Sequence, residues 1–136
     1  MKLRKDFIID NKADFEKLLL EEAVHVRDKI DQIKLIGNIN LLDNAFNFVL
    51  SVVGNKQEAV TELGTKEGIT WARHNLTLDF KLEWIQAIRK TLWKLLYEFD
   101  HLGKKQKTKE EYYNLQVVIN SLIDEFFRVF LKLFRL

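Results

Sequence analysis

The chain contains no cysteine and no proline, and only five glycines are spread over its 136 residues. Without cysteine there is no disulfide framework, no thiolate nucleophile and no cysteine-based zinc site. Because the turns of β proteins rely on glycine and proline, the scarcity of both favours an all-α fold. No apolar run approaches the ~20 residues of a membrane span. The amino-terminal segment MKLRKDFIIDNKADF has too many charges for a signal peptide. We therefore expect a soluble, cytoplasmic protein.

The composition fits one globular domain over residues 1–136. Hydrophobic residues make up 47% of the chain and charged residues 31%, with ten phenylalanines and three tryptophans available for a core. This balance excludes an intrinsically disordered chain. The net charge is only +2, which argues against a nucleic-acid-binding protein, since such a protein needs a concentrated basic face.

Hydrophobic periodicity predicts five helices, over about residues 11–35, 39–53, 56–75, 78–101 and 108 to the end of the chain. Asn38 and Thr108 have the character of N-caps for the second and fifth helices. The second helix is apolar nearly all round, which predicts a central position. Gly64 and Gly68 predict a kink or a break in the third.

The last helix carries more large apolar side chains than one small core can cover: Phe126, Phe127, Val129, Phe130, Leu131, Leu133, Phe134 and Leu136. Surplus apolar surface of this kind marks association. We expect a homodimer formed through the last two helices. A helix lying on a membrane surface is the alternative, but Arg128, Lys132 and Arg135 supply only part of the cationic face that it needs.

Signatures of catalysis are absent. The only serines, Ser51 and Ser121, are not in nucleophile elbows, and no glycine-rich phosphate loop is present. The histidines His25, His74 and His101 do not have metal-ligand spacing. We expect a protein that is not an enzyme and that has neither a metal nor a cofactor.

Arg89, in the stretch LEWIQAIRKTLW, is a cation in an apolar stripe. At ~100° per residue its neighbours on the helix are Leu82, Ile85, Trp93 and Leu96. A buried guanidinium costs several kcal/mol unless an anion meets it. Two partners fit: an internal carboxylate such as Glu67, Asp79 or Asp124, or the carboxylate of a ligand with an apolar chain.

The segment WARHNL contains two further candidate site residues, Arg73 and His74. Arg73 is either a solvent-exposed cation or a second candidate for the ligand carboxylate. His74 lies before a break and a long helix, a place comparable to that of the proximal histidine in heme globins. Glu67 lies seven residues earlier on the same stripe, so the two residues are also candidates for a buried polar pair.

The run GITWARHNLTLDFKLEWIQAIRKTLWKLLYEF, residues 68–99, resembles the non-heme globin sensor domains of spore-forming bacilli. The recognisable elements are EW, Q-A-x-R and L-W-x-L-L-Y. These domains occur at the amino terminus of sporulation sensor histidine kinases, and the chain is most similar to the stand-alone, plasmid-encoded sporulation inhibitors of the anthrax bacillus.

The resemblance implies a dimeric, globin-like fold without heme, in which a hydrophobic tunnel holds a fatty acid. In that family the carboxylate meets an arginine and a chloride ion, and the domain sequesters the signal that activates a related kinase. Carried to this sequence, the arginine is Arg89 or Arg73, and His74 is the next candidate for the polar chamber. The tunnel-lining residues expected from central helix faces are Phe46, Val49, Leu50, Val53, Trp71, Ile85, Ile88, Leu92 and Trp93.

Two other functions fit the sequence. The first is a heme-binding gas sensor of the globin class, which rests on His74 alone. The second is a pure interaction protein that heterodimerises with the sensor domain of the kinase through the last helix. In that case Arg89 would belong to a structural ion pair.

Overall fold

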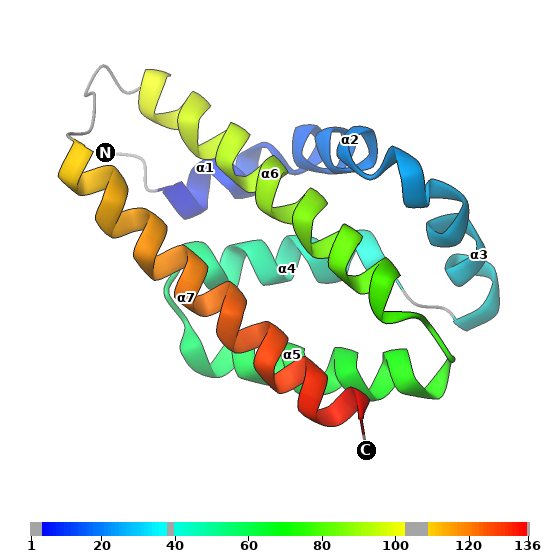
Figure 1. Cartoon of the computed structure of the whole chain (residues 1–136). Coiled ribbons are helices and arrows are strands. Elements are labelled where there is room, and N and C mark those ends of the chain that lie inside the picture. The colour runs from blue at the N-terminus through cyan, green and yellow to red at the C-terminus, as the bar shows by residue number, and fades with distance from the viewer. Residues whose placement is uncertain (1–3, 38–39, 103–108, 136) are drawn as a thin grey trace.

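The computed structural model of the chain describes residues 4–37, 40–102 and 109–135. Every regular element in these ranges is helical, which confirms the all-α class (Figure 1). The elements are α1 (Arg4–Asp10), α2 (Lys12–Glu22), the 3₁₀ helix η1 (Val24–Val26), α3 (Arg27–Gly37), α4 (Leu41–Val53), α5 (Gln57–Arg73), α6 (Leu78–Leu102) and α7 (Lys109–Phe134). None of these helices is long and apolar enough to cross a membrane, within the described ranges.

The predicted caps Asn38 and Thr108 lie outside the described residues. The N-cap of α4 is Asn40, whose side chain accepts a hydrogen bond of 3.1 Å from the backbone N–H of Asp43. Asn40 also donates to the Asp43 carboxylate at 2.7 Å. A backbone N–H that would otherwise lack a partner is thereby satisfied at the start of α4.

The first predicted helix is divided. Instead of one helix over residues 11–35, α2 ends at Glu22 and α3 begins at Arg27, with η1 between them. The tighter 3₁₀ turn buries Ala23 and Val26 against α6 and leaves Val24 59% exposed. Packing against α6 therefore overrides a periodicity that would suit a continuous helix.

The central position predicted for the second helix is confirmed. Helix α4 packs against α1, α2, α5, α6 and α7. Its buried residues are spread around the helix, namely Leu41, Ala45, Phe46, Phe48, Val49 and Val52. A helix that is buried on several sides needs apolar residues nearly all round, as this sequence has.

The break predicted at Gly64 and Gly68 is wrong, whereas a kink stays a prediction. Helix α5 is continuous from Gln57 to Arg73, and both glycines face α7. A Cβ at Gly68 would lie 2.7 Å from the backbone carbonyl oxygen of Phe130, and one at Gly64 would lie 2.9 Å from that of Phe126. The glycines thus let the two helix backbones approach closely, and helix α7 lies along α5 (Figure 1).

This close approach covers much of the apolar surplus in the last helix. Of the large apolar residues predicted to be in surplus, Phe126, Val129 and Phe130 are buried. Four others are half-buried: Phe127, Leu131, Leu133 and Phe134. Leu136 lies outside the described residues. The most exposed apolar residues of α7 are instead in its first half, at Tyr113, Val117 and Val118.

Candidate functional site

Arg89 lies at the edge of the buried stripe of α6. The centre of that stripe is formed by Trp84, Ile88 and Leu92, which are almost completely buried. Arg89 is half-buried, and its flanking residue Leu82 is 43% exposed. The guanidinium therefore sits at the boundary between the core and the solvent, where an apolar surface meets water.

The Nε atom of Arg89 is buried, and among the described residues no acceptor lies within hydrogen-bonding distance of it. The carboxylates considered for an internal ion pair do not supply one. Glu67 pairs with Lys81, and Asp79 and Asp124 are exposed. A buried donor without an acceptor costs about 1–3 kcal/mol, so Arg89 retains the capacity to bind an anion.

An open hollow of about 430 Å³ lies beside Arg89. All of its lining residues belong to α6: Arg89, Lys90, Trp93, Lys94 and Tyr97. Lys94 already forms an ion pair with Glu22 of α2. The hollow thus offers two aromatic surfaces together with the ammonium of Lys90 and the guanidinium of Arg89, whose Nε has no acceptor among the described residues.

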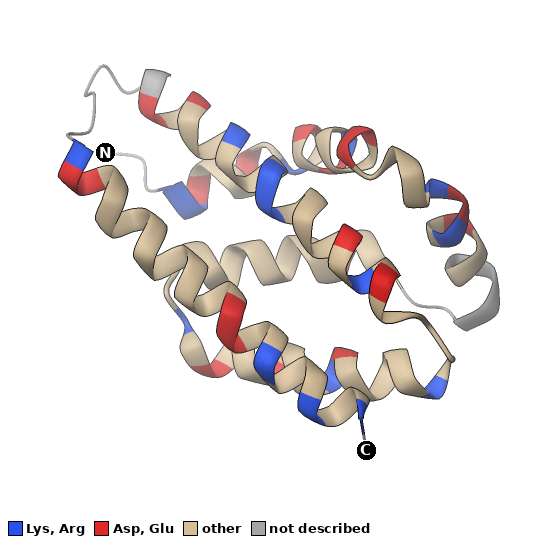
Figure 2. Cartoon of the chain, in the orientation of Figure 1, with Lys and Arg blue, Asp and Glu red and all other residues tan. Residues whose placement is uncertain are grey.

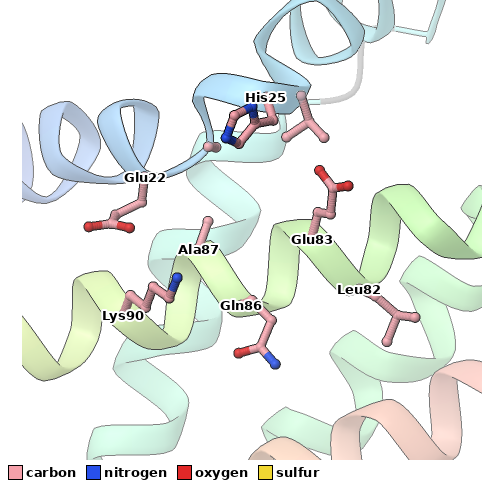
Figure 3. Close-up of a pocket in the computed structure, with 9 residues that line it drawn as sticks. Glu22, His25, Leu82, Glu83, Gln86, Ala87 and Lys90 are labelled. Carbon is pink, nitrogen blue, oxygen red and sulfur yellow. The ribbon is translucent and has the colours of Figure 1, made fainter.

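A second hollow, of about 290 Å³, shares Lys90 with the first and lies between η1 and α6 (Figure 3). Ala23, Val26, Leu82 and Ala87 supply its apolar surface, and Glu22, His25, Glu83, Gln86 and Lys90 its polar groups. Its carboxylates disfavour a second anion. The hydrogen bond from Lys94, followed by the charges of Lys94 and Lys90, lowers the pKa of Glu22 below its ordinary value despite partial desolvation.

Arg73 and His74 lie at the end of α5, away from the middle of α6. Arg73 is exposed in the last turn, and His74 is the half-buried C-cap residue, whose backbone N–H donates to the carbonyl oxygen of Thr70 at 3.1 Å. Arg89 comes eleven residues after Leu78, at which α6 begins, or about 16 Å along the helix axis. The apolar hollow thus contains Arg89 and neither of the other two candidates.

The residues expected to line a tunnel are mostly packed in the core. Phe46, Val49, Trp71, Ile85, Ile88 and Leu92 belong to one buried cluster, against which Leu50, Val53 and Trp93 are partly buried. Trp93 lines the hollow beside Arg89, whereas Leu50 and Val53 line two other hollows. Of the predicted lining residues, Trp93 alone is among those that line the Arg89 hollow, and the others are divided between the core and separate surface hollows.

The core also holds a charged group that the sequence interpretation missed. Lys81 of α6 is 1% exposed, and its Nζ donates a hydrogen bond of 2.5 Å to Oε2 of Glu67 in α5. Three rings surround this ammonium, with centroids at 4.2 Å for Trp71, 4.9 Å for Phe130 and 5.0 Å for Phe126. The ion pair and the cation–π contacts link α5, α6 and α7.

Burial lowers the pKa of Lys81 below its ordinary 10.5, and the carboxylate of Glu67 opposes this effect. The buried polar pair foreseen between Glu67 and His74 is thus formed by Glu67 and Lys81. The signal was present in the sequence, because Lys81 precedes Trp84, Ile85 and Ile88 by three, four and seven residues.

The residues that the structure describes contain no cluster of three or more histidine, aspartate or glutamate side chains suited to a metal ion. In comparisons with known proteins, the chain matches no family model, no curated protein and no solved structure. The geometry of the site and the resemblance of residues 68–99 therefore carry the functional interpretation.

Proposed function

We propose that the protein is a non-catalytic, globin-like sensor domain without heme that binds a fatty acid at Arg89. By sequestering this signal from a related sporulation histidine kinase in the cytoplasm, it would inhibit sporulation. The observation that carries the proposal is the buried, unpartnered Nε of Arg89 beside an apolar hollow. The globin-like fold, the kinase and sporulation come from the resemblance of residues 68–99.

The chemistry of the hollow suits a carboxylate with an apolar chain. The guanidinium presents a fork of donors that matches a carboxylate. Trp93 and Tyr97 follow Arg89 by about one and two turns of α6 and line the same hollow. Each buried methylene contributes about 0.8 kcal/mol, so the chain supplies affinity while the arginine fixes the polarity of binding. Lys90 adds a second cation, beside which the chloride ion of the resembling family would be bound.

The open form of the hollow favours a site completed by a second copy. Small-molecule sites usually bury 70–90% of their ligand, which residues from one helix do not achieve.

We place the partner copy over α6 and α7. The exposed apolar residues Tyr97, Tyr113, Val117 and Val118 belong to these two helices. Figure 2 shows a long uncharged part of α7, and residues 112–123 contain no charged side chain. Depletion of charge is typical of the centre of an interface.

The same surface supports a second candidate function. If α7 pairs with the related sensor domain of the kinase, the protein inhibits by heterodimerisation and needs no ligand. The exposed, uncharged face around Val117 favours this alternative as much as it favours the homodimer. The two functions differ in what they require of Arg89, which is essential for ligand sequestration and dispensable for heterodimerisation.

Titration with a brominated long-chain fatty acid tests the ligand site, because bromine quenches tryptophan fluorescence only at short range. Half-buried Trp93 lines the hollow, whereas Trp71 and Trp84 lie in the core. We expect saturable quenching that Trp93→Phe removes. Arg89→Leu should weaken binding about 10- to 100-fold, since it removes a charge-assisted bidentate contact.

Arg73→Leu is the matched control, because it removes the same charge from the exposed end of α5. The affinity of this variant for the brominated fatty acid should stay within about twofold of that of the wild type. If Arg73→Leu loses fatty-acid binding while Arg89→Leu binds normally, the carboxylate is bound by Arg73 and not by Arg89. If Arg89→Leu binds no ligand but still inhibits the kinase, the heterodimerisation function is correct.

A further inference from the structure

We propose a second ligand site, distinct from the hollow at Arg89, where Arg4, Lys5 and Lys56 bind the anionic head group of a short-chain amphiphile. Its ligand class is a carboxylate or a phosphate monoester with a short aliphatic chain. The site lies where α1 meets the end of α4 and the start of α5, with α6 and α7 beside it. Neither the sequence nor the resemblance assigns a role to these cations.

Two hollows meet at Lys5. One, of about 260 Å³, is lined by Arg4, Lys5 and a mostly aliphatic surface made of Val52, Val53, Gly54, Leu96, Leu115, Val118 and Ile119. The other, of about 430 Å³, is more polar and includes Lys5, Lys56 and Lys66. Lys5 therefore stands between an apolar hollow and a cationic one, which is the arrangement that an amphipathic anion needs.

The cations in this region exceed the anions. The side chains of Lys5 and Lys56 lie within hydrogen-bonding reach of each other, and this contact lowers the pKa of Lys5 from its ordinary 10.5. Glu62 lines the same hollow and Asp6 follows Lys5, but in the described part of the chain neither Lys5 nor Lys56 has a carboxylate in an ion pair. Two like charges in contact are unfavourable, and an anion between them relieves the repulsion.

Arg4 adds a donor that lacks an acceptor. Its terminal nitrogen lies 3.7 Å from Oδ1 of Asp100, but its Nε is buried and has no hydrogen-bond partner among the described residues. Because Arg4 lines the apolar hollow, a head-group oxygen at the mouth would be within the reach of this donor. The start of α5 reinforces the preference for an anion, since its N-cap residue Lys56 makes no capping hydrogen bond with its side chain.

The size of the apolar hollow restricts the chain of the ligand. A volume of about 260 Å³ lies below the usual ~300–1,000 Å³ of small-molecule sites, so a long fatty acid does not fit. We expect chains of medium length, such as an octyl group, with Val53 and Leu115 in contact with the methylenes. The chain length thus distinguishes this ligand from the long-chain fatty acid proposed for Arg89.

Calorimetric titration of the full chain with octanoate, octyl phosphate, octanol and inorganic phosphate tests the proposal. Lys5→Gln combined with Lys56→Gln should weaken octanoate and octyl phosphate binding at least about tenfold. The matched control is Lys17→Gln combined with Lys132→Gln, which removes the same charge from exposed positions of α2 and α7. The control should bind both octyl anions within about twofold of the wild type.

Val53→Phe tests the apolar part, because a larger side chain fills the hollow; its circular dichroism should match that of the wild type. We expect weaker binding of octyl phosphate and unchanged binding of inorganic phosphate. The proposal is overturned if the wild type binds none of the octyl anions at millimolar concentration. It is also overturned if the lysine control loses as much affinity as the test variant, or if inorganic phosphate binds as tightly as octyl phosphate. Normal quenching of Trp93 by the brominated fatty acid in the double lysine variant keeps this site separate from the proposed fatty-acid function.

Discussion

Replacing Lys81 by methionine should destabilise the protein strongly, although methionine fits the apolar surroundings. Lys81 is 1% exposed, and its only carboxylate partner in the described structure is Glu67, which is 9% exposed. Breaking a buried ion pair from one side leaves a buried charge uncompensated, which costs about 3–5 kcal/mol. For a domain of this size that corresponds to a fall in Tm of roughly 10 to 20 °C.

The double variant Lys81→Met with Glu67→Leu separates the charge effect from the loss of packing. It removes both charges and places a thioether among the rings of Trp71, Phe126 and Phe130, where sulfur–aromatic contacts replace the cation–π contacts. We expect its free energy of unfolding within about 1 kcal/mol of the wild type, or above it. Urea denaturation followed by circular dichroism measures both variants.

The burial of Lys81 also predicts a pH dependence. Burial lowers the pKa of Lys81 below 10.5 in the folded chain, so between this lowered pKa and 10.5 the unfolded chain binds more protons. The free energy of unfolding therefore gains a contribution that increases with pH across this window, and Lys81→Met removes it. If Lys81→Met is as stable as the wild type, or if the double variant is no more stable than the single one, the reasoning about the buried pair is refuted.

Three further predictions concern packing, association and heme. Gly68→Ala should destabilise the protein by about 1–3 kcal/mol, because its Cβ would meet the Phe130 carbonyl oxygen at 2.7 Å and the Leu133 Cβ at 2.9 Å. Urea denaturation measures this free energy of unfolding. A cost equal to that of Gly54→Ala, at an exposed turn, would contradict the close approach of α5 and α7. Val117→Lys should convert the proposed dimer to a monomer at micromolar concentration, since it places a charge in the uncharged face of α7. Light scattering measures the mass, and circular dichroism should show unchanged helix content. A wild type that is already monomeric would refute the proposed dimer. Heme addition should give no Soret band from a ligated iron, and a band that disappears in His74→Ala would establish the heme alternative.

Hydrophobic periodicity predicted the helical class and the central place of α4 because both depend on local patterns. It did not predict the division at Ala23, since that break follows from the packing of η1 against α6. Gly64 and Gly68 predict a kink or a break from the sequence because their low helix propensity is a local property. Their close approach to α7 is a contact between segments far apart in the chain, which one sequence does not show.

The candidate site shows the same limit. Helical spacing of ~100° per residue predicts Arg89 inside the apolar stripe of α6. In the structure the centre of the stripe passes through Trp84, Ile88 and Leu92, and Arg89 lies at its edge. The same test applied to Lys81 would have found the charge that is fully buried. Helical spacing alone gives the face of a residue to within about one position, so it separates the centre of a buried stripe from its edge only when every charged residue of the helix is tested in turn.

The central claim is that Arg89 holds the carboxylate of a long-chain fatty acid. Mass spectrometry of the organic extract from denatured wild type, Arg89→Leu and Arg73→Leu, all purified from the same host, tests it most directly. We predict a long-chain carboxylic acid in the wild type and in Arg73→Leu, and less than about a tenth of that amount in Arg89→Leu. An equal amount in Arg89→Leu, or none in the wild type, would contradict the claim.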